Sequence, residues 1–266
     1  MTKSQQIYPT DLNDTQWSKI RPYLPAEAKT GRPREHGWRM ILNGIFYLLQ
    51  SGCSWRMLPS DLPPWKTVYH YFRVWRTNGT WERLNRLLRE KVRLQFGKKR
   101  QPSATILDSQ SSRTSEGGLE RGFDAGKKVS GRKRHALVDP LGLLMKVVVT
   151  AGNVQDRDGA KQLLEAMAKE EQVIKRLKLI WADGSYRGEL ITWIEDLFGW
   201  KLEIVEKPKD QNGFQALPKR WIVERTFAWL VHQRRLARDY ERLPQTSEAF
   251  IYTAMIRLMI RRLAKI

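Results

Sequence analysis

The sequence predicts an α/β protein in which a mixed sheet flanked by helices follows an all-helical N-terminal part. Two observations carry this prediction. Residues 1–97 repeat apolar side chains at helical spacing between turn signals, whereas residues 104–266 alternate strand-like runs with helical patterns. A basic, helix-breaking stretch separates them. We therefore expect a helical domain (1–97), a linker (98–103) and an α/β domain (104–266).

The charge of the chain indicates a polyanionic partner. Its 48 Lys and Arg side chains exceed its 28 Asp and Glu side chains by 20. This excess favours nucleic acid over a membrane surface. Cys53 is the single cysteine, which excludes an intrachain disulfide and a thiolate zinc cluster. No apolar run is long enough to span a bilayer, and no secretory signal follows Met1, so we expect a cytoplasmic protein without membrane contact.

The N-terminal part is predicted to consist of short helices joined by tight turns. We expect helices at 15–24, 36–51, 54–58, 65–77 and 80–92, and Gly52 is placed to end the second of them. This arrangement fits a helix-turn-helix type of DNA-binding module. Its candidate DNA contacts are the cations of one helix: Lys66, His70, Arg73 and Arg76. The alternative is a helical cap with a solvated basic face.

The second part begins with a short strand at 104–107 that ends on Asp108. A glycine-rich basic segment, 113–131, is expected to be a mobile loop. Strands at 133–138 and 143–150 form a hairpin around the turn signal Asp139-Pro140. The remaining elements are a helix at 158–168, a strand at 177–182, a helix at 188–198, a strand at 201–205, a loop at 206–218, a long helix ending near Tyr240, and an amphipathic helix at 246–266.

Three acids stand in apolar sequence: Asp108 and Asp183 at strand ends, and Glu224 on the long helix. Ends of adjacent strands and one turn of a covering helix can bring three carboxylates within reach of shared metal ions. Mg²⁺ prefers oxygen ligands, and a carboxylate inside an apolar strand is costly unless a cation neutralises it. Two such ions would serve phosphodiester cleavage. Singly, each acid could instead cap a turn or, for Glu224, pair with Arg220 or Arg225.

Three other acids are weaker candidates. Asp139 precedes a proline in a turn, and Asp158 is suited to cap a helix. Asp156 could support the site from behind its metal ligands. We therefore expect structural roles for Asp139 and Asp158.

Several segments resemble the DDE transposases of bacterial insertion sequences, of the IS-five type. They are LDSQSS, GRKRHALVDPLGLLMKVVVTAGNVQDRDGA, WADGSYRG and RWIVERTFAWL with RRLARDYER, together with WRMILNGIFYLLQSGCSWRMLP and WKTVYHYFRVW near the N-terminus. The resemblance implies an RNase H-like catalytic core dependent on two Mg²⁺ (or Mn²⁺) ions, with Asp108, Asp183 and Glu224 as its catalytic and metal-binding acids. It implies binding of terminal inverted repeats, cleavage and strand transfer into target DNA in the bacterial nucleoid.

One departure concerns the last catalytic helix, where related transposases carry Tyr, Arg, Glu and Lys at fixed spacing. Arg220 and Glu224 fit that pattern, but Leu217 and Val231 occupy the Tyr and Lys places. Arg234 or Arg235, one turn further on, could replace the lysine.

The remaining DNA contacts that we expect fall into two groups. Phosphates near the site would be held by Arg220, Arg225, Arg234 and Arg235, and the backbone would be followed by Lys127, Lys128, Arg132, Lys133 and Arg134. Because two element ends must be held together, a homodimer on double-stranded DNA is expected. The rival interpretations are a DNA-binding regulator that has lost catalysis and an RNase H-like nuclease without transposition.

Overall fold

The structure, a computed structural model, describes residues 8–26, 34–169, 175–206 and 218–265. Its sheet contains β4 (Leu144–Ala151), β3 (Val129–Val138), β1 (Ala104–Arg113), β5 (Leu179–Ala182) and β6 (Lys201–Ile204) as successive neighbours, and the short β2 (Gly122–Asp124) continues along β3 beyond β4. The first three of these neighbours are antiparallel and the last three are parallel. This is the RNase H-like mixed sheet that the resemblance implies, so the predicted α/β class is confirmed.

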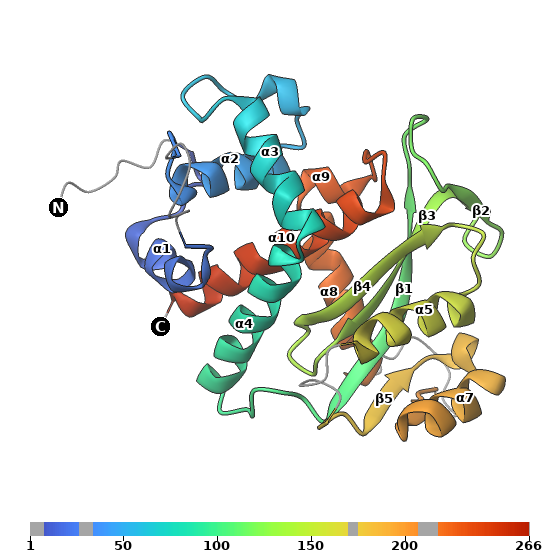
Figure 1. Cartoon of the computed structure of the whole chain (residues 1–266). Helices are drawn as coiled ribbons and strands as arrows, with labels where there is room; N and C mark the ends of the chain where they lie inside the picture. The colour runs from blue at the N-terminus through green and yellow to red at the C-terminus, as the bar shows by residue number, and fades with distance from the viewer. Residues whose placement is uncertain (1–7, 27–33, 170–174, 207–217, 266) are drawn as a thin grey trace.

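Helices cover both faces of this sheet (Figure 1). One face packs against α5 (Asp156–Ala168) and α7 (Glu189–Phe198), and the other against α8 (Pro218–Val231) and α10 (Pro244–Leu263). Successive side chains of β1 point to opposite faces of the sheet. Leu107 belongs to the hydrophobic cluster under α5, and Ile106 belongs to the cluster under α8. The central strands are therefore buried on both sides, which explains their long apolar runs.

The N-terminal part contains the predicted helices. They are α1 (Asp14–Ile20), a 3₁₀ turn (Arg21–Tyr23), α2 (Trp38–Ser51), a second 3₁₀ turn (Trp55–Met57), α3 (Trp65–Thr77) and α4 (Thr80–Gln95). A capping box between Asn13 and Gln16 starts α1. Gly52 ends α2 in the left-handed conformation with a φ of 73°, as its place in the sequence predicted.

The C-terminal helix α10 packs against both parts of the chain. It contacts β4 and α8 on one side and α1, α2, α3 and α4 on the other (Figure 1). One hydrophobic cluster accordingly includes Phe46 and Trp75 from the N-terminal helices and Phe250 and Ile256 from α10. The division of the chain at 98–103 stays a prediction, and the main apolar core crosses it.

A polar clamp also fastens α4 to the β3–β4 hairpin. Arg93 donates to Asp139 over 2.5 Å, and both side chains are buried. The other oxygen of Asp139 accepts from the backbone N–H groups of Leu141 and Leu143, at 2.9 and 2.8 Å. Asp139 therefore has the structural turn role that the sequence suggested, with an ion pair to a helix that the sequence did not indicate.

Two predicted segments differ in the structure. The predicted loop at 113–131 is partly sheet, because β1 runs to Arg113 and pairs with β3 as far as Gly131. The strands approach so closely that a Cβ at Gly131 would lie 2.0 Å from the Ser112 carbonyl oxygen. The long helix predicted to end near Tyr240 stops at Val231. Extended backbone at Gln233 then separates it from the short α9 (Arg234–Ala237).

None of the described helices is both long enough and apolar enough to cross a membrane.

We predict that Arg93→Met destabilises the protein by about 3–5 kcal/mol, because it leaves the buried Asp139 carboxylate without its cation. Urea unfolding followed by circular dichroism measures this change. Arg100→Met, at an exposed position of the same charge, should change stability by less than about 0.5 kcal/mol. Equal effects of the two substitutions would contradict the clamp.

Candidate active site

Asp108 and Asp183 lie at matching heights on neighbouring parallel strands. The last β1–β5 pair is Ile106 with Trp181, and each acid follows its member of that pair by two positions. The backbone at Asp183 remains extended, with φ −85° and ψ −179°. Because side chains two residues apart on a strand share a face, both carboxylates point to the α8 side of the sheet. The register thus brings together two acids that are 75 positions apart (183 − 108).

Helix α8 brings Glu224 to the same side. Val223 and Phe227 anchor this helix in the apolar core, which leaves Glu224 exposed at the edge of the sheet. One turn earlier, the Arg220 guanidinium lies 3.6 Å from Glu224 Oε1 and 3.7 Å from Asp183 Oδ2. The Arg220 guanidinium therefore lies close to both the Asp183 and the Glu224 carboxylates.

The Asp108 carboxyl is half-buried at the wall of the site. Burial, with a contribution from the nearby Asp183 charge, raises its pKa to about 7 against the opposing effects of the Ser109 N–H, Lys127 and Arg220. The Ser109 N–H donates to Asp108 Oδ1 over 2.7 Å. The Asp183 carboxylate has a different hydrogen-bond partner: its Oδ1 caps the following turn by accepting from the Ser185 N–H at 2.9 Å. The turn role considered for Asp183 is thus filled by one oxygen, while the other faces Arg220.

A groove of about 580 Å³ joins Asp108 to Glu224. Its walls come from β1, from the β2–β3 turn and from α8, and include Lys127, Phe227, Val231 and His232. The Lys127 ammonium donates to the Ser109 carbonyl oxygen over 3.1 Å, which fixes it beside Asp108. The groove is therefore lined by two acids and one cation and can admit a charged ligand.

A second polar layer lies beneath Asp108, on the opposite face of β1. Ser109 Oγ donates to Asp156 over 2.8 Å, and the Lys133 ammonium lies 3.2 Å from Asp156 and 3.5 Å from Asp124. The buried Tyr186 hydroxyl lies in the same electrostatic environment, and burial together with Asp108 raises its pKa well above the ordinary value. Asp156 is thus placed behind the site, as the sequence suggested it could be.

The donor chemistry of the three acids suits a hard divalent cation. All their donor atoms are carboxylate oxygens, which Mg²⁺ and Mn²⁺ accept, and two of the groups already share the Arg220 cation. Within the described chain, no three His, Cys, Asp or Glu side chains are gathered closely enough to hold a metal ion. The three acids lie in one region, and their carboxylate oxygens are the type of ligand that such a cation binds. Arg220 lies between Asp183 and Glu224.

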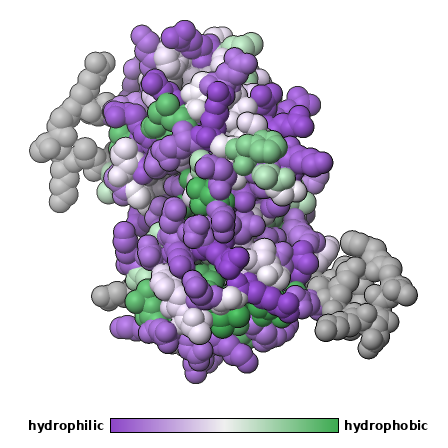
Figure 2. All heavy atoms as spheres, turned by 90° about the vertical axis from the view of Figure 1, so that its right-hand side faces the viewer, coloured by the Kyte–Doolittle hydropathy of each residue, from purple (hydrophilic) through white to green (hydrophobic). Residues whose placement is uncertain are grey.

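Half of the other twelve side chains expected to contact DNA are exposed. Lys66, His70 and Arg73 are exposed along α3, whereas Arg76 is half-buried and donates to Thr246. Lys127, Lys128 and Arg234 are also exposed. Arg225 is half-buried, with its guanidinium 4.5 Å from the Trp221 ring and 4.8 Å from the Trp229 ring. Figure 2 shows the face at the right-hand side of Figure 1, which is mostly hydrophilic with small separate hydrophobic groups.

The expectation that Arg132, Lys133, Arg134 and Arg235 contact DNA is wrong, because all four side chains are buried. Arg132 pairs with Asp239 at 3.2 Å and donates to the Glu241 carbonyl oxygen at 2.9 Å. Arg235 pairs with Glu241 at 2.7 Å and is therefore no substitute for the missing lysine. Burial lowers the Arg134 pKa to about 10, and this guanidinium donates to the Leu236 carbonyl oxygen over 2.9 Å. Arg132 and Arg134 thus fasten β3 to the segment after α8.

Three members of this region were not predicted from the sequence. Asp124 fell within the predicted loop, and its partners Ser111 and Lys133 identify it only in the fold. Ser109 and Tyr186 follow Asp108 and Asp183 by one and three positions, but neither residue type is diagnostic there. Proximity to the predicted acids was the one available signal.

Comparisons with known proteins place the chain among mobile-element proteins. Residues 12–85 match the family described as "Putative transposase of IS4/5 family", and residues 99–259, more than half of the chain, match the family described as "Transposase DDE domain". The chain is 29% identical over 126 residues to the "Putative transposase for insertion sequence element IS402" of Burkholderia cepacia, an alignment covering 46% of this chain and 59% of the relative.

Two other relatives match shorter segments. The "Insertion element IS402 uncharacterized 16.2 kDa protein" of Burkholderia cepacia is 34% identical over 89 residues, which is 31% of this chain and 60% of the relative. The "Uncharacterized protein y4sN" of Sinorhizobium fredii is 27% identical over 85 residues, 32% of this chain and 68% of the relative. The matches span about three fifths of the length of the two Burkholderia cepacia relatives.

We predict that Asp108→Asn stabilises the metal-free protein at pH 8 by up to about 4 kcal/mol and changes it little at pH 4. The folded state binds the Asp108 proton more tightly than the unfolded state does. This contribution to stability is present below about pH 4 and is lost as pH rises through about 7. Asparagine removes that loss.

Urea unfolding with a chelator present, at pH 4 and pH 8, measures the effect. Asp196→Asn, at an exposed position of α7, should shift stability by less than about 0.5 kcal/mol at both values. An Asp108→Asn effect that does not depend on pH would contradict the buried environment of this carboxyl.

Proposed function

This chain belongs to the IS4/5-type transposases with a DDE domain, and from that premise we propose that it cuts DNA at the ends of an insertion sequence and joins those ends to target DNA. The observation that carries the proposal is the matching register of Asp108 and Asp183 on β1 and β5, with Glu224 reaching the same side from α8. A regulator that only binds DNA has no need of acids so arranged.

Asp108, Asp183 and Glu224 would hold the divalent ions that DDE domains use, and we propose two Mg²⁺ or Mn²⁺ ions. Two such ions supply activation of the attacking oxygen and neutralisation of charge on the leaving oxygen. The raised pKa of Asp108 means that this carboxyl gives up a proton when a cation binds near neutral pH. Asp183 keeps one oxygen on its turn and offers the other to the site.

Arg220 has a second part in this proposal. Its guanidinium neutralises Asp183 and Glu224 while they are close together, at 3.7 and 3.6 Å. If Asp183 and Glu224 hold a divalent ion, the planar donor fork of Arg220 would be free to bind a DNA phosphate beside the cleavage point. Lys127, fixed on Ser109 at the groove wall, would steady a neighbouring phosphate.

The element ends would bind on the accessible cations outside the groove. Lys66, His70 and Arg73 form an exposed row on α3, and Lys128 and Arg234 are exposed elsewhere on the surface. These groups support recognition of double-stranded terminal repeats by a homodimer in the cytoplasm, because two ends must be held together while both are cut.

We predict that Asp108→Asn, Asp183→Asn and Glu224→Gln each bind end-bearing DNA like the parent protein but no longer nick it in Mg²⁺. Each change removes one charged oxygen donor and leaves side-chain size nearly constant. Asp158→Asn, at an exposed acid on α5, should nick at the parent rate. The assay follows labelled element ends on a denaturing gel.

Undiminished nicking by Asp108→Asn would remove the proposed site. A parent protein that binds but never cuts would instead be the regulator, and cleavage without strand-transfer products would indicate a nuclease.

We predict that the double variant Lys66→Gln/Arg73→Gln lowers DNA affinity and reduces the steepness of its salt dependence. Each phosphate contact contributes about 0.9 to the slope of log affinity against log salt, so the slope should fall by about 2. Fluorescence anisotropy in the Asp108→Asn background measures it. Lys91→Gln/Lys201→Gln removes the same charge at exposed sites away from α3 and should leave the slope unchanged. The same slope change in both double variants would show that only net charge matters.

A further inference from the structure

A separate pocket lies between α8 and α10. Its volume is about 230 Å³. Trp229, Leu230 and Gln233 line it from α8 and the residues just after that helix, whereas Phe227, Ala228 and Val231 line the catalytic groove. The two sites therefore use different faces of one helix, and a ligand in the pocket does not touch the three acids.

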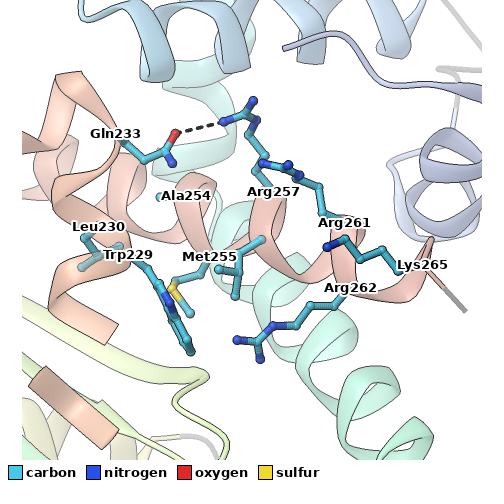
Figure 3. Close-up of a pocket in the computed structure, with 10 residues that line it drawn as sticks. Trp229, Leu230, Gln233, Ala254, Met255, Arg257, Arg261, Arg262 and Lys265 are labelled. Carbon is cyan, nitrogen blue, oxygen red and sulfur yellow. Dashed lines mark hydrogen bonds between the residues drawn. The ribbon is translucent and has the colours of Figure 1, made fainter. Parts of the chain in front are cut away.

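Four cations surround this pocket. Figure 3 shows Arg257, Arg261 and Arg262 extending from α10 and Lys265 from the residues just after it, with Trp229 and Leu230 facing them from the other side. The remaining lining residues are Ala254, Met255 and Leu258, and none of the described residues that line the pocket carries a carboxylate side chain. Arg257 and Arg261 are four positions apart on one side of α10, and Lys265 continues from them beyond the end of the helix. An apolar floor beneath a cationic rim fits an anionic group attached to an organic body.

Arg257 carries a positive charge that the described chain does not balance. Its side chain is 8% exposed, and Nη1 donates to the neutral amide oxygens of Gln50 at 2.6 Å and Gln233 at 3.1 Å (Figure 3). Burial and the neighbouring Arg261 lower its pKa to about 10. A buried charge without a counter-charge is costly, and an anion in the pocket would relieve that cost.

Arg262, at the wall of the pocket, is also held in place by its neighbours. The Arg262 guanidinium lies 4.6 Å from the Trp229 ring, and Arg225 approaches the same ring at 4.8 Å. Burial and the Arg225 charge both lower the Arg262 pKa. Neutral amides thus hold the Arg257 guanidinium and an indole ring holds that of Arg262, which also feels the Asp139 charge, whereas Arg261 and Lys265 are exposed at the rim. Fixed guanidinium groups suit phosphate, which accepts their paired hydrogen bonds.

We propose that this pocket binds a backbone phosphate of DNA at a position other than the cleavage point, and so forms a second DNA contact on the C-terminal helix. The inference rests on the proposed function, which supplies DNA as the polyanion. The exposed rim favours a phosphate within a strand over a free ion, because Arg261 and Lys265 extend the cationic row beyond the pocket, where neighbouring phosphates would follow. The apolar floor would take the sugar.

The test compares two double variants of the full chain in the Asp108→Asn background, with a chelator present. Arg261→Gln/Lys265→Gln removes two rim charges at exposed positions, and Lys98→Gln/Arg100→Gln removes two exposed charges near the linker. We expect the rim variant to lose about tenfold or more in affinity for end-bearing duplex DNA, and about 2 in its salt slope. The linker variant should lose less than twofold. Thermal melts verify that both are folded.

Ethylation of single phosphates locates the contact. One or two phosphates whose ethylation weakens binding by the parent should no longer matter to the rim variant. Inorganic phosphate provides the second arm: if it raises the melting temperature of the parent but not of the rim variant, while both bind DNA equally, the pocket takes a free anion and the proposal is overturned.

Equal DNA affinities of the rim and linker variants, with normal binding by the parent, would also overturn it and leave the proposed function standing. A parent that does not bind end-bearing DNA would overturn both.

Discussion

The arrangement of this protein follows from the mutual repulsion of carboxylates at one edge of a sheet. The register of β1 and β5 sets Asp108 beside Asp183, and α8 adds Glu224. Three devices offset the repulsion: Asp108 holds its proton to about pH 7, Asp183 gives one oxygen to a turn, and Arg220 links Asp183 with Glu224. Each device is reversible, which is what the proposed binding of a divalent cation to these acids requires.

Several other charges of the scaffold are buried as ion pairs that connect its elements. Arg93 on Asp139 fastens α4 to the hairpin, and Arg132 on Asp239 fastens β3 to the segment after α8. Helix α10 then joins both parts of the chain in one apolar core. Against this pattern, the cations of the α8–α10 pocket stand out because neutral amides and an indole ring hold them.

Sequence patterns predicted the elements whose signals are local. The predicted bounds of α3 agree with the structure at both ends, and Gly52 ends α2 as predicted. The predicted order of strands and helices also indicated the mixed sheet. The burial of Arg132, Arg134 and Arg235 could not be predicted, because their partners lie at Asp239, Glu241 and the Leu236 carbonyl, which only the fold brings near. A cationic strand with weak alternation has the same sequence pattern whether its side chains face water or pair with a carboxylate that is distant in the sequence. The division at 98–103 likewise gave no sign that one core crosses it.

Mn²⁺ binding to the full chain near pH 7, followed by electron paramagnetic resonance with simultaneous detection of released protons, tests whether the three acids share one site. We expect the parent to take up Mn²⁺ with release of the Asp108 proton, and Asp108→Asn, Asp183→Asn and Glu224→Gln each to weaken uptake about tenfold or more, as loss of a metal ligand does. Mn²⁺ uptake that is unchanged in Asp183→Asn or Glu224→Gln would contradict a shared site for the three acids.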